Sequence, residues 1–150
     1  MEHVDLKDGF LKKKQDLNAE KTVHAVYNRS KETGRIDAFK LEWKKGKTPT
    51  PHKFWDSDVA KWVEAAAYSL YHHEDPDIRK KLDETIKLIE SAQQEDGYLN
   101  IRYTVVEPEL KWKNLRDNHE LYCAGHLMEA AVAVKRYVED DRLMKVMEKY

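Results

Sequence analysis

The segment from His119 to Ala133, HELYCAGHLMEAAVA, places the tightest limit on what this chain can fold into. At helical spacing, one stripe of this segment begins with His119, Tyr122 and His126 and becomes alanine-rich only later. A stripe that served only a hydrophobic core would carry leucine, isoleucine and valine throughout. Polar groups at one end of a buried face therefore predict a helix whose first turns line a cavity. The small residues also let neighbouring helices approach closely, as a crowded helical barrel requires.

Helical periodicity recurs along the rest of the chain. Ser57 is a good N-cap for the second helix, and Asp75-Pro76 combines a cap with proline at the first helical position of the third. Gly34 and Gly97 mark irregular stretches that follow helices. We expect four helices and the start of a fifth: about 10–30, from 57 onward, from 76 to before 97, about 115–138, and from about 141.

Connection lengths and helix character both alternate along the chain. The connections before the third and fifth helices are short, whereas the one from Glu95 to Asn114 is long. The second and fourth helices are alanine-rich, while the third carries charged residues on its outer side. Alternating inner and outer helices with the long loops at one end describe a toroid of helical hairpins. The predicted fold is all-α, with residues 1–150 as the N-terminal, partial segment of an (α/α)6-barrel domain.

Composition excludes several classes of protein. The formal net charge is −1, and Lys and Arg are scattered among Asp and Glu, so nucleic acid is not an expected partner. No apolar run approaches the roughly 20 residues that span a bilayer, and the N-terminus lacks a signal-peptide pattern. The single cysteine, Cys123, cannot form an internal disulfide, which fits a reducing compartment. We expect a cytoplasmic protein without a membrane partner.

Several adjoining motifs resemble one enzyme family. These are GRIDAF, WDSDVAKWVEAAAYSL, LIESAQQEDGYLN and NHELYCAGHLMEAAVA, which begin at residues 34, 55, 88 and 118. In order and approximate spacing they resemble the β-L-arabinofuranosidase family, glycoside hydrolase family 127. The resemblance covers nearly the whole chain. It implies an (α/α)6 barrel, followed in full-length relatives by β-sandwich domains.

The resemblance also implies an activity and a cofactor. The family is taken to cleave terminal β-L-arabinofuranosides with retention, using a cysteine thiolate held by a zinc site and a glutamate as acid/base. Those residues belong to the later part of the barrel, so this chain is expected to lack the nucleophile, to bind no zinc and to be inactive alone. The expected partner is a glycoside or oligosaccharide, and a homodimer of the full-length protein stays open.

His119 is the main candidate for contact with the sugar. It matches the family histidine that hydrogen-bonds the arabinose, and an imidazole can donate from one nitrogen and accept at the other. Weaker candidates for substrate binding are Trp55, Asp58, Asp96, Tyr122 and His126.

Ordinary structural roles compete with each of these interpretations. Helix capping and the helix dipole explain Asp58 and its neighbour Asp56, while the Asp96-Gly97 turn explains Asp96. Trp62 is expected in the core, and His126 is expected to be packed and hydrogen-bonded. For Glu120 the favoured role is a salt bridge to Arg116 or Lys113, and for Cys123 that of a small buried hydrophobe. A metal face of His119, Cys123 and His126 is disfavoured, because HELYC is not HExxH and no carboxylate ligand is apparent.

Two other classes of function stay open at this point. Amphipathic hairpins are also the unit of solenoids, so the chain could be a non-catalytic module that binds a protein partner. Against this, no short repeat recurs along the sequence. Another sugar-active enzyme on the same toroid, such as an epimerase or an unsaturated uronide hydrolase, is the second alternative.

Overall fold

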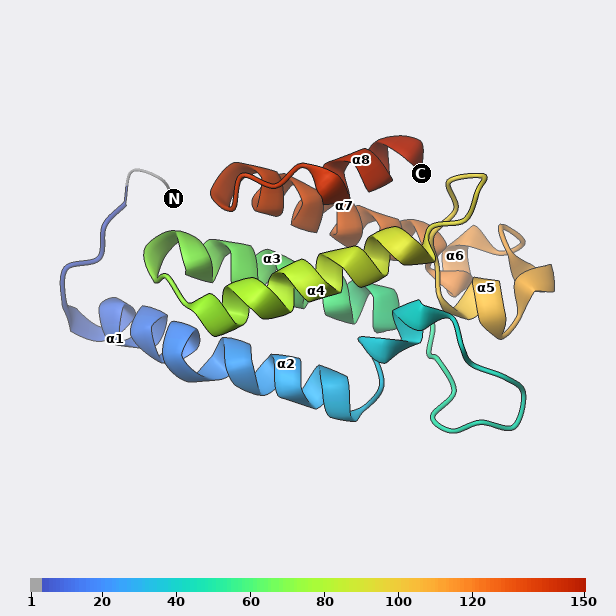
Figure 1. The fold of residues 1–150 in the computed structure, drawn as a ribbon, viewed down its shortest axis with the longest axis horizontal. Helices are drawn as coiled ribbons and strands as arrows, with labels where there is room; N and C mark the ends of the chain where they lie inside the picture. Colours follow the sequence, from blue (N-terminus) through green and yellow to red (C-terminus); the bar gives the residue numbers. More distant parts are fainter. Residues whose placement is uncertain (1–3) are drawn as a thin grey trace.

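The computed structural model describes residues 4–150, and within them every regular element is a helix. Figure 1 shows the long helices running along one axis, with the long irregular connections gathered at the end opposite α1. The elements are α1 (Gly9–Leu17), η1 (Asn18–Thr22), α2 (Val23–Glu32), η2 (Asp37–Lys40), α3 (Trp55–His72), α4 (Pro76–Ala92), α5 (Arg102–Val105), η3 (Pro108–Leu110), α6 (Leu115–Asn118), α7 (Glu120–Tyr137) and α8 (Arg142–Lys149).

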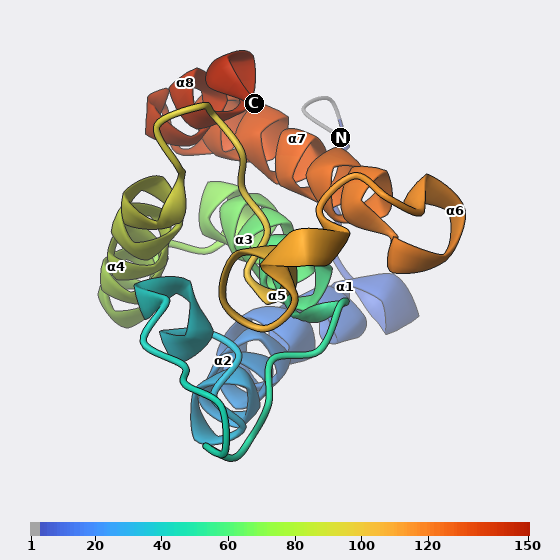
Figure 2. The ribbon, with the colours of Figure 1, turned by 90° about the vertical axis from the view of Figure 1, so that its right-hand side faces the viewer.

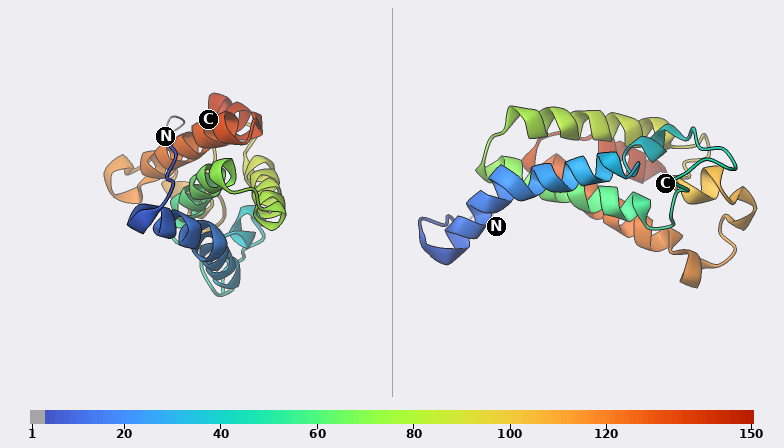
Figure 3. Two further views of the ribbon diagram at one scale, coloured as in Figure 1. Left: turned by 90° about the vertical axis from the view of Figure 1, so that its left-hand side faces the viewer. Right: turned by 90° about the horizontal axis from the view of Figure 1, so that it is seen from below.

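Helix α3 lies at the centre of the molecule. Seen end-on, it is surrounded by α2, α4 and α7, and α8 lies over α7 (Figure 2). Its most extensive packing is against α7, which is the other alanine-rich helix. The predicted inner helices are therefore neighbours. Helix α1 contributes no buried residue and extends past the ends of the other helices (Figures 1 and 3).

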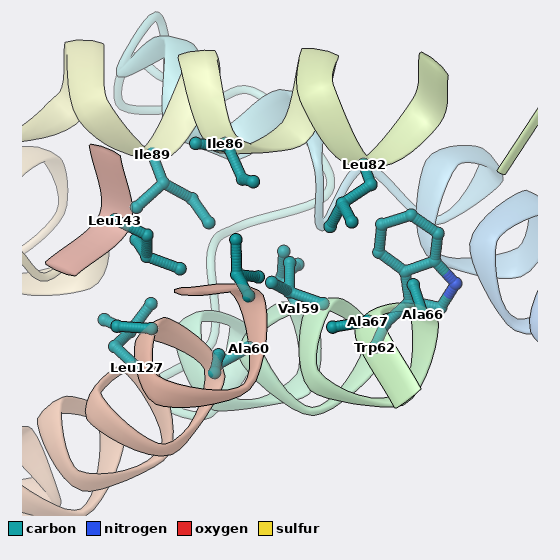
Figure 4. Close-up of a cluster of buried hydrophobic side chains, with 14 of the residues drawn as sticks. Val59, Ala60, Trp62, Ala66, Ala67, Leu82, Ile86, Ile89, Leu127 and Leu143 are labelled. Atoms are coloured by element: carbon teal, nitrogen blue, oxygen red, sulfur yellow. The ribbon is translucent and has the colours of Figure 1, made fainter. Parts of the chain in front are cut away.

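The core forms where α3 meets α4, α7 and α8. Fully buried alanines on α3 and α7 keep the two backbones close, and larger aliphatic side chains from α4 and α8 cover the seam. The labelled members in Figure 4 are Val59, Ala60, Trp62, Ala66, Ala67, Leu82, Ile86, Ile89, Leu127 and Leu143. As expected, Trp62 is a core residue, and its indole Nε1 donates to the Val23 carbonyl at 2.9 Å.

The start of α4 follows the predicted capping chemistry. The Asp75 carboxylate accepts from the backbone N–H groups of Asp77 and Ile78 at 2.9 and 3.0 Å, and Pro76 opens the helix. The start of α3 does not. Ser57 is not its N-cap, because the helix begins at Trp55 and the Ser57 hydroxyl donates to the Phe54 carbonyl at 2.8 Å. Within residues 4–150 no helix is both long and apolar enough to cross a membrane.

The predicted fourth helix is interrupted. The backbone at His119 has φ +59°, in the left-handed region, so the single helix expected over about 115–138 is divided into α6 and α7. A residue other than glycine in this conformation is uncommon and carries a cost in conformational energy. The first helical hydrogen bond of α7 still forms, because the His119 carbonyl accepts from the backbone N–H of Cys123 at 3.0 Å.

Candidate functional site

Four rings come together where α3 and α7 begin. The centroid of the Phe54 ring lies 4.8 Å from that of His119 and 5.8 Å from that of Tyr122. The Tyr122 centroid lies 6.0 Å from that of His119 and 4.7 Å from that of His126. We call Phe54, His119, Tyr122 and His126 the ring cluster. It unites three predicted residues of the α7 stripe and adds Phe54, which the sequence analysis did not single out.

The polar atoms of the ring cluster differ in whether they have partners within the described chain. The His119 imidazole forms no hydrogen bond to any residue in the range 4–150, and its ring lies beside those of Phe54 and Tyr122. The Tyr122 hydroxyl accepts from the Lys61 ammonium at 2.8 Å. His126 Nδ1 lies 2.9 Å from a carboxylate oxygen of Glu129. A donor and an acceptor at His119 are therefore available to a ligand.

The segment that carries Phe54 is held from three sides. Arg102, in α5, donates from Nη1 to the Pro51 carbonyl at 2.8 Å. The Lys53 ammonium donates to the Asp117 carbonyl at 2.8 Å, and the Cys123 thiol donates to the Lys53 carbonyl at 3.2 Å. These contacts fix the approach to α3 against α5, α6 and α7. They thereby fix the position of the Phe54 ring beside His119.

Three of the weaker candidates lie apart from the ring cluster. Trp55 is buried, and the guanidinium of Arg35 lies 5.6 Å from its ring centroid. The Asp58 carboxylate accepts from Arg35 Nε at 3.0 Å and lines a groove of about 380 Å³ between α2 and α3. Asp96 accepts from the Lys111 ammonium at 2.6 Å and from a backbone N–H within its own turn. These contacts are a ring contact in the interior, an ion pair and a turn, and each gives its residue a role in the fold.

The Glu120 side chain faces the interior. It is fully buried and accepts from the Tyr98 hydroxyl at 2.5 Å and from the Trp112 backbone N–H at 3.1 Å. The expected salt bridge to Arg116 or Lys113 is therefore wrong. Arg116 instead donates to the carboxylate of the adjacent Asp117. The loop from Tyr98 to Trp112 folds back onto the start of α7, and burial together with Glu120 raises the pKa of Tyr98.

Asp56 is the second buried carboxylate, at the start of α3. Its Oδ1 accepts from the Ile101 backbone N–H at 2.9 Å, whereas Oδ2 has no hydrogen-bond partner within residues 4–150. Burial raises the pKa of Asp56 to about 7, despite the opposing hydrogen bond. The capping role expected for Asp56 and Asp58 is wrong, because no side chain caps α3, but both lie in its first turn, as the helix-dipole argument expects. We call Asp56 and Glu120 the buried carboxylates.

Cys123, in the first turn of α7, is fully buried. Burial, followed by the charge of Asp56, raises the pKa of its thiol to about 12. The thiol therefore stays protonated near neutral pH, which disfavours both attack on a substrate and metal ligation. Within the described residues no three His, Cys, Asp or Glu side chains are grouped as metal ligands. These residues do not fit the zinc site that the resemblance implies for the family.

Comparison with known proteins identifies the family. Residues 3–150 match the model of the β-L-arabinofuranosidase GH127 catalytic domain. This chain belongs to that family. A curated relative, the non-reducing end β-L-arabinofuranosidase of Bifidobacterium longum subsp. longum, is 39% identical over 100 residues, which cover 64% of this chain. The family and this relative are glycoside hydrolases.

Solved GH127 structures have the same fold. Ara127N, a GH127 β-L-arabinofuranosidase from Geobacillus stearothermophilus T6, superposes over 99% of this chain with a TM-score of 0.91 and 42% sequence identity. A second GH127 β-arabinofuranosidase covers 98% with a TM-score of 0.86 and 27% identity. These likenesses confirm the predicted all-α toroid class. The chain spans 25% of each solved chain and 15% of the curated relative.

The sequence analysis missed Phe54 and Lys61. A usable pattern was present, because Phe54, Asp58 and Lys61 follow one another at i, i+4 and i+7 on one side of α3. That stripe resembles the one formed by His119, Tyr122 and His126 on α7. Two neighbouring inner helices with polar stripes at the same end predict a shared cavity wall.

Proposed function

We propose that this chain forms part of the sugar-binding wall of a retaining β-L-arabinofuranosidase, with His119 contacting the terminal arabinose. The observation that carries this proposal is the ring cluster, in which the His119 imidazole lies beside aromatic rings and has no hydrogen-bond partner among residues 4–150. Ligand sites commonly combine apolar and aromatic walls with a few polar groups that set orientation. A furanose with several hydroxyl groups suits this combination.

The chemistry of bond cleavage is assigned to groups outside the ring cluster. A retaining glycosidase needs a nucleophile and an acid/base on opposite sides of the scissile bond. The buried, protonated Cys123 thiol does not supply the first, and Glu120 is fully engaged by Tyr98 and Trp112. We therefore propose that residues 1–150 bind and orient the sugar, and that the zinc-held nucleophile expected from the family lies elsewhere in the enzyme.

Activity on the expected sugar tests the proposal. A protein of the relatives' length that contains this chain is assayed on aryl β-L-arabinofuranoside, with other aryl glycosides as controls. NMR of the first product formed reports its anomeric configuration. Turnover of the arabinofuranoside with retention supports the proposal. Activity only on another sugar would contradict the assignment of arabinofuranoside as the substrate. Binding of a protein partner without turnover of any glycoside would favour a non-catalytic module.

The isolated chain offers a second test. Residues 1–150 alone are expected to show no glycosidase activity, because positioning does not replace an absent nucleophile. The purified chain is assayed on the same substrate with and without added zinc. Metal-dependent turnover that survives the Cys123→Ala change would contradict this division of roles.

A further inference from the structure

Lys61 lies on α3, directly across from the α7 stripe. Its ammonium donates to the Tyr122 hydroxyl at 2.8 Å but lies 5.1 Å from the centroid of that ring. The ammonium is therefore at the oxygen end of the phenol and not over its face. This hydrogen bond joins the two inner helices on the same side as the ring cluster.

No carboxylate neutralises Lys61 within residues 4–150. The nearest acidic residues along α3 are Asp58 and Glu64, and both have other partners. Asp58 pairs with Arg35 at 3.0 Å, and a carboxylate oxygen of Glu64 accepts from the Tyr68 hydroxyl at 3.0 Å. Across the seam, Glu129 lies against His126. A lysine held in place by a neutral phenol, with no counter-ion, differs from the surface ion pairs of α4, such as that between Lys87 and Asp83 at 2.8 Å.

We propose that Lys61 is a further sugar-binding residue, which donates a hydrogen bond to a hydroxyl oxygen of the arabinose that His119 contacts. This inference rests on the proposed function. An ammonium has three N–H donors, and Tyr122 accepts only one of them. The Tyr122 phenol accepts that bond and so keeps its own O–H to donate. Lys61, Tyr122 and His119 then form a row of donors that can bind neighbouring hydroxyl groups of one sugar.

The competing role for Lys61 is a structural tie between two helices. An exposed hydrogen bond of this kind contributes only about 1 kcal/mol to stability. The two roles make different predictions for substrates that lack single hydroxyl groups. Loss of a sugar contact removes the discrimination for one hydroxyl, whereas loss of a tie affects every substrate alike.

The test uses Lys61→Met in a protein of the relatives' length that contains this chain. Aryl β-L-arabinofuranoside and its monodeoxy analogues are the substrates. We expect kcat/KM on the parent sugar to fall roughly 10- to 100-fold, with Tm lowered by no more than about a few degrees. On one deoxy analogue the wild type and variant should differ less than three-fold, because the hydroxyl that Lys61 binds is already missing. Lys80→Met, on the exposed side of α4, is the matched control and should match the wild type on all substrates.

Two results overturn the inference, and they are distinguishable. If the wild type cleaves the arabinofuranoside and Lys61→Met either leaves kcat/KM unchanged or lowers it equally for every analogue, Lys61 is not a sugar contact. If the wild type has no activity on the arabinofuranoside, the proposed function fails first and the inference fails with it. Tyr122→Phe provides a second readout. It removes both the acceptor that holds the Lys61 ammonium and the O–H donor of the phenol, so KM should increase by a larger factor than kcat decreases, and an unchanged KM would contradict the row of donors.

Discussion

The ring cluster and the buried carboxylates meet at the start of α7, where the adjacent residues His119 and Glu120 use their polar atoms in opposite ways. Glu120 is fully buried and receives hydrogen bonds from Tyr98 and Trp112. His119, the residue before it, has no hydrogen-bond partner for its imidazole within residues 4–150, and its backbone is in the left-handed region. Satisfied buried groups indicate a structural role, whereas free polar groups on a strained backbone indicate binding. Under the proposed function, Glu120 therefore serves the stability of the fold, and the adjacent His119 serves binding of the sugar.

The largest expected effect is on stability, at Glu120. Glu120→Ala removes the acceptor of the Tyr98 hydroxyl and the Trp112 N–H, and each buried donor left without a partner costs about 1–3 kcal/mol. We expect the free energy of unfolding of the 150-residue chain to fall by about 4 kcal/mol in urea denaturation. His119→Ala in the same chain should change it by less than about 1 kcal/mol. Equal losses of stability for the two variants would mean that Glu120 and His119 do not differ in structural role.

The next largest effect is on activity, at His119. In a protein of the relatives' length, His119→Ala should lower kcat/KM on aryl β-L-arabinofuranoside roughly 10- to 1000-fold. This range corresponds to one or two lost hydrogen bonds to a tightly held substrate. Circular dichroism and Tm confirm that the variant is folded. Normal kinetics of folded His119→Ala would remove the ring cluster from the sugar site.

The same comparison shows what the sequence could and could not predict. The stripe of His119, Tyr122 and His126 follows from helical spacing, and the Asp75 cap follows from chemistry local to that turn. The role of Glu120 depends on Tyr98, which is 22 residues away along the chain and reaches Glu120 only after the loop folds back. The break at His119 has no glycine to mark it. Local patterns therefore predicted the helices and the stripe. A hydrogen bond between residues on either side of a long loop, such as that from Tyr98 to Glu120, could not be predicted from them.

Asp56 is expected to make the free energy of unfolding depend on pH. Its pKa in the folded chain is raised to about 7, from an ordinary value of 3.8. Folding therefore favours the protonated form, so the contribution of this group is most favourable below about pH 4 and is lost as the pH rises through 7. The loss is on the order of 4 kcal/mol at most, and the N-terminal end of α3 reduces it by stabilising the anion.

Asp56→Asn isolates this contribution, because the amide oxygen can still accept from Ile101. The free energy of unfolding of the wild type and of Asp56→Asn is measured between pH 4 and pH 8. The stability of the variant relative to the wild type should increase with pH by about 1–3 kcal/mol. Parallel pH profiles for the two proteins would mean that Asp56 is ionised throughout, with a partner for its second oxygen.

The smallest effect on activity is expected at Cys123, one helical turn after His119 and Glu120 on α7. The thiol is fully buried, is protonated because its pKa is about 12, and donates to the Lys53 carbonyl at 3.2 Å. Through this hydrogen bond it supports the segment that carries Phe54. Cys123→Ala should keep kcat/KM within a few-fold of the wild type and lower stability by about 1 kcal/mol, through the lost hydrogen bond and an underfilled packing site.

Cys123→Ser distinguishes packing from hydrogen bonding at this position, because a hydroxyl is a smaller side chain that can still donate to Lys53. Unfolding in urea and steady-state kinetics are measured for both variants. If the thiol acts only as a support, the two variants differ in stability while their kcat/KM values stay within a few-fold of the wild type. A folded but inactive Cys123→Ala protein, together with a normal His119→Ala protein, would reverse the roles. The buried side of α7 would then contain a residue needed for catalysis, and the ring cluster would have only a structural role.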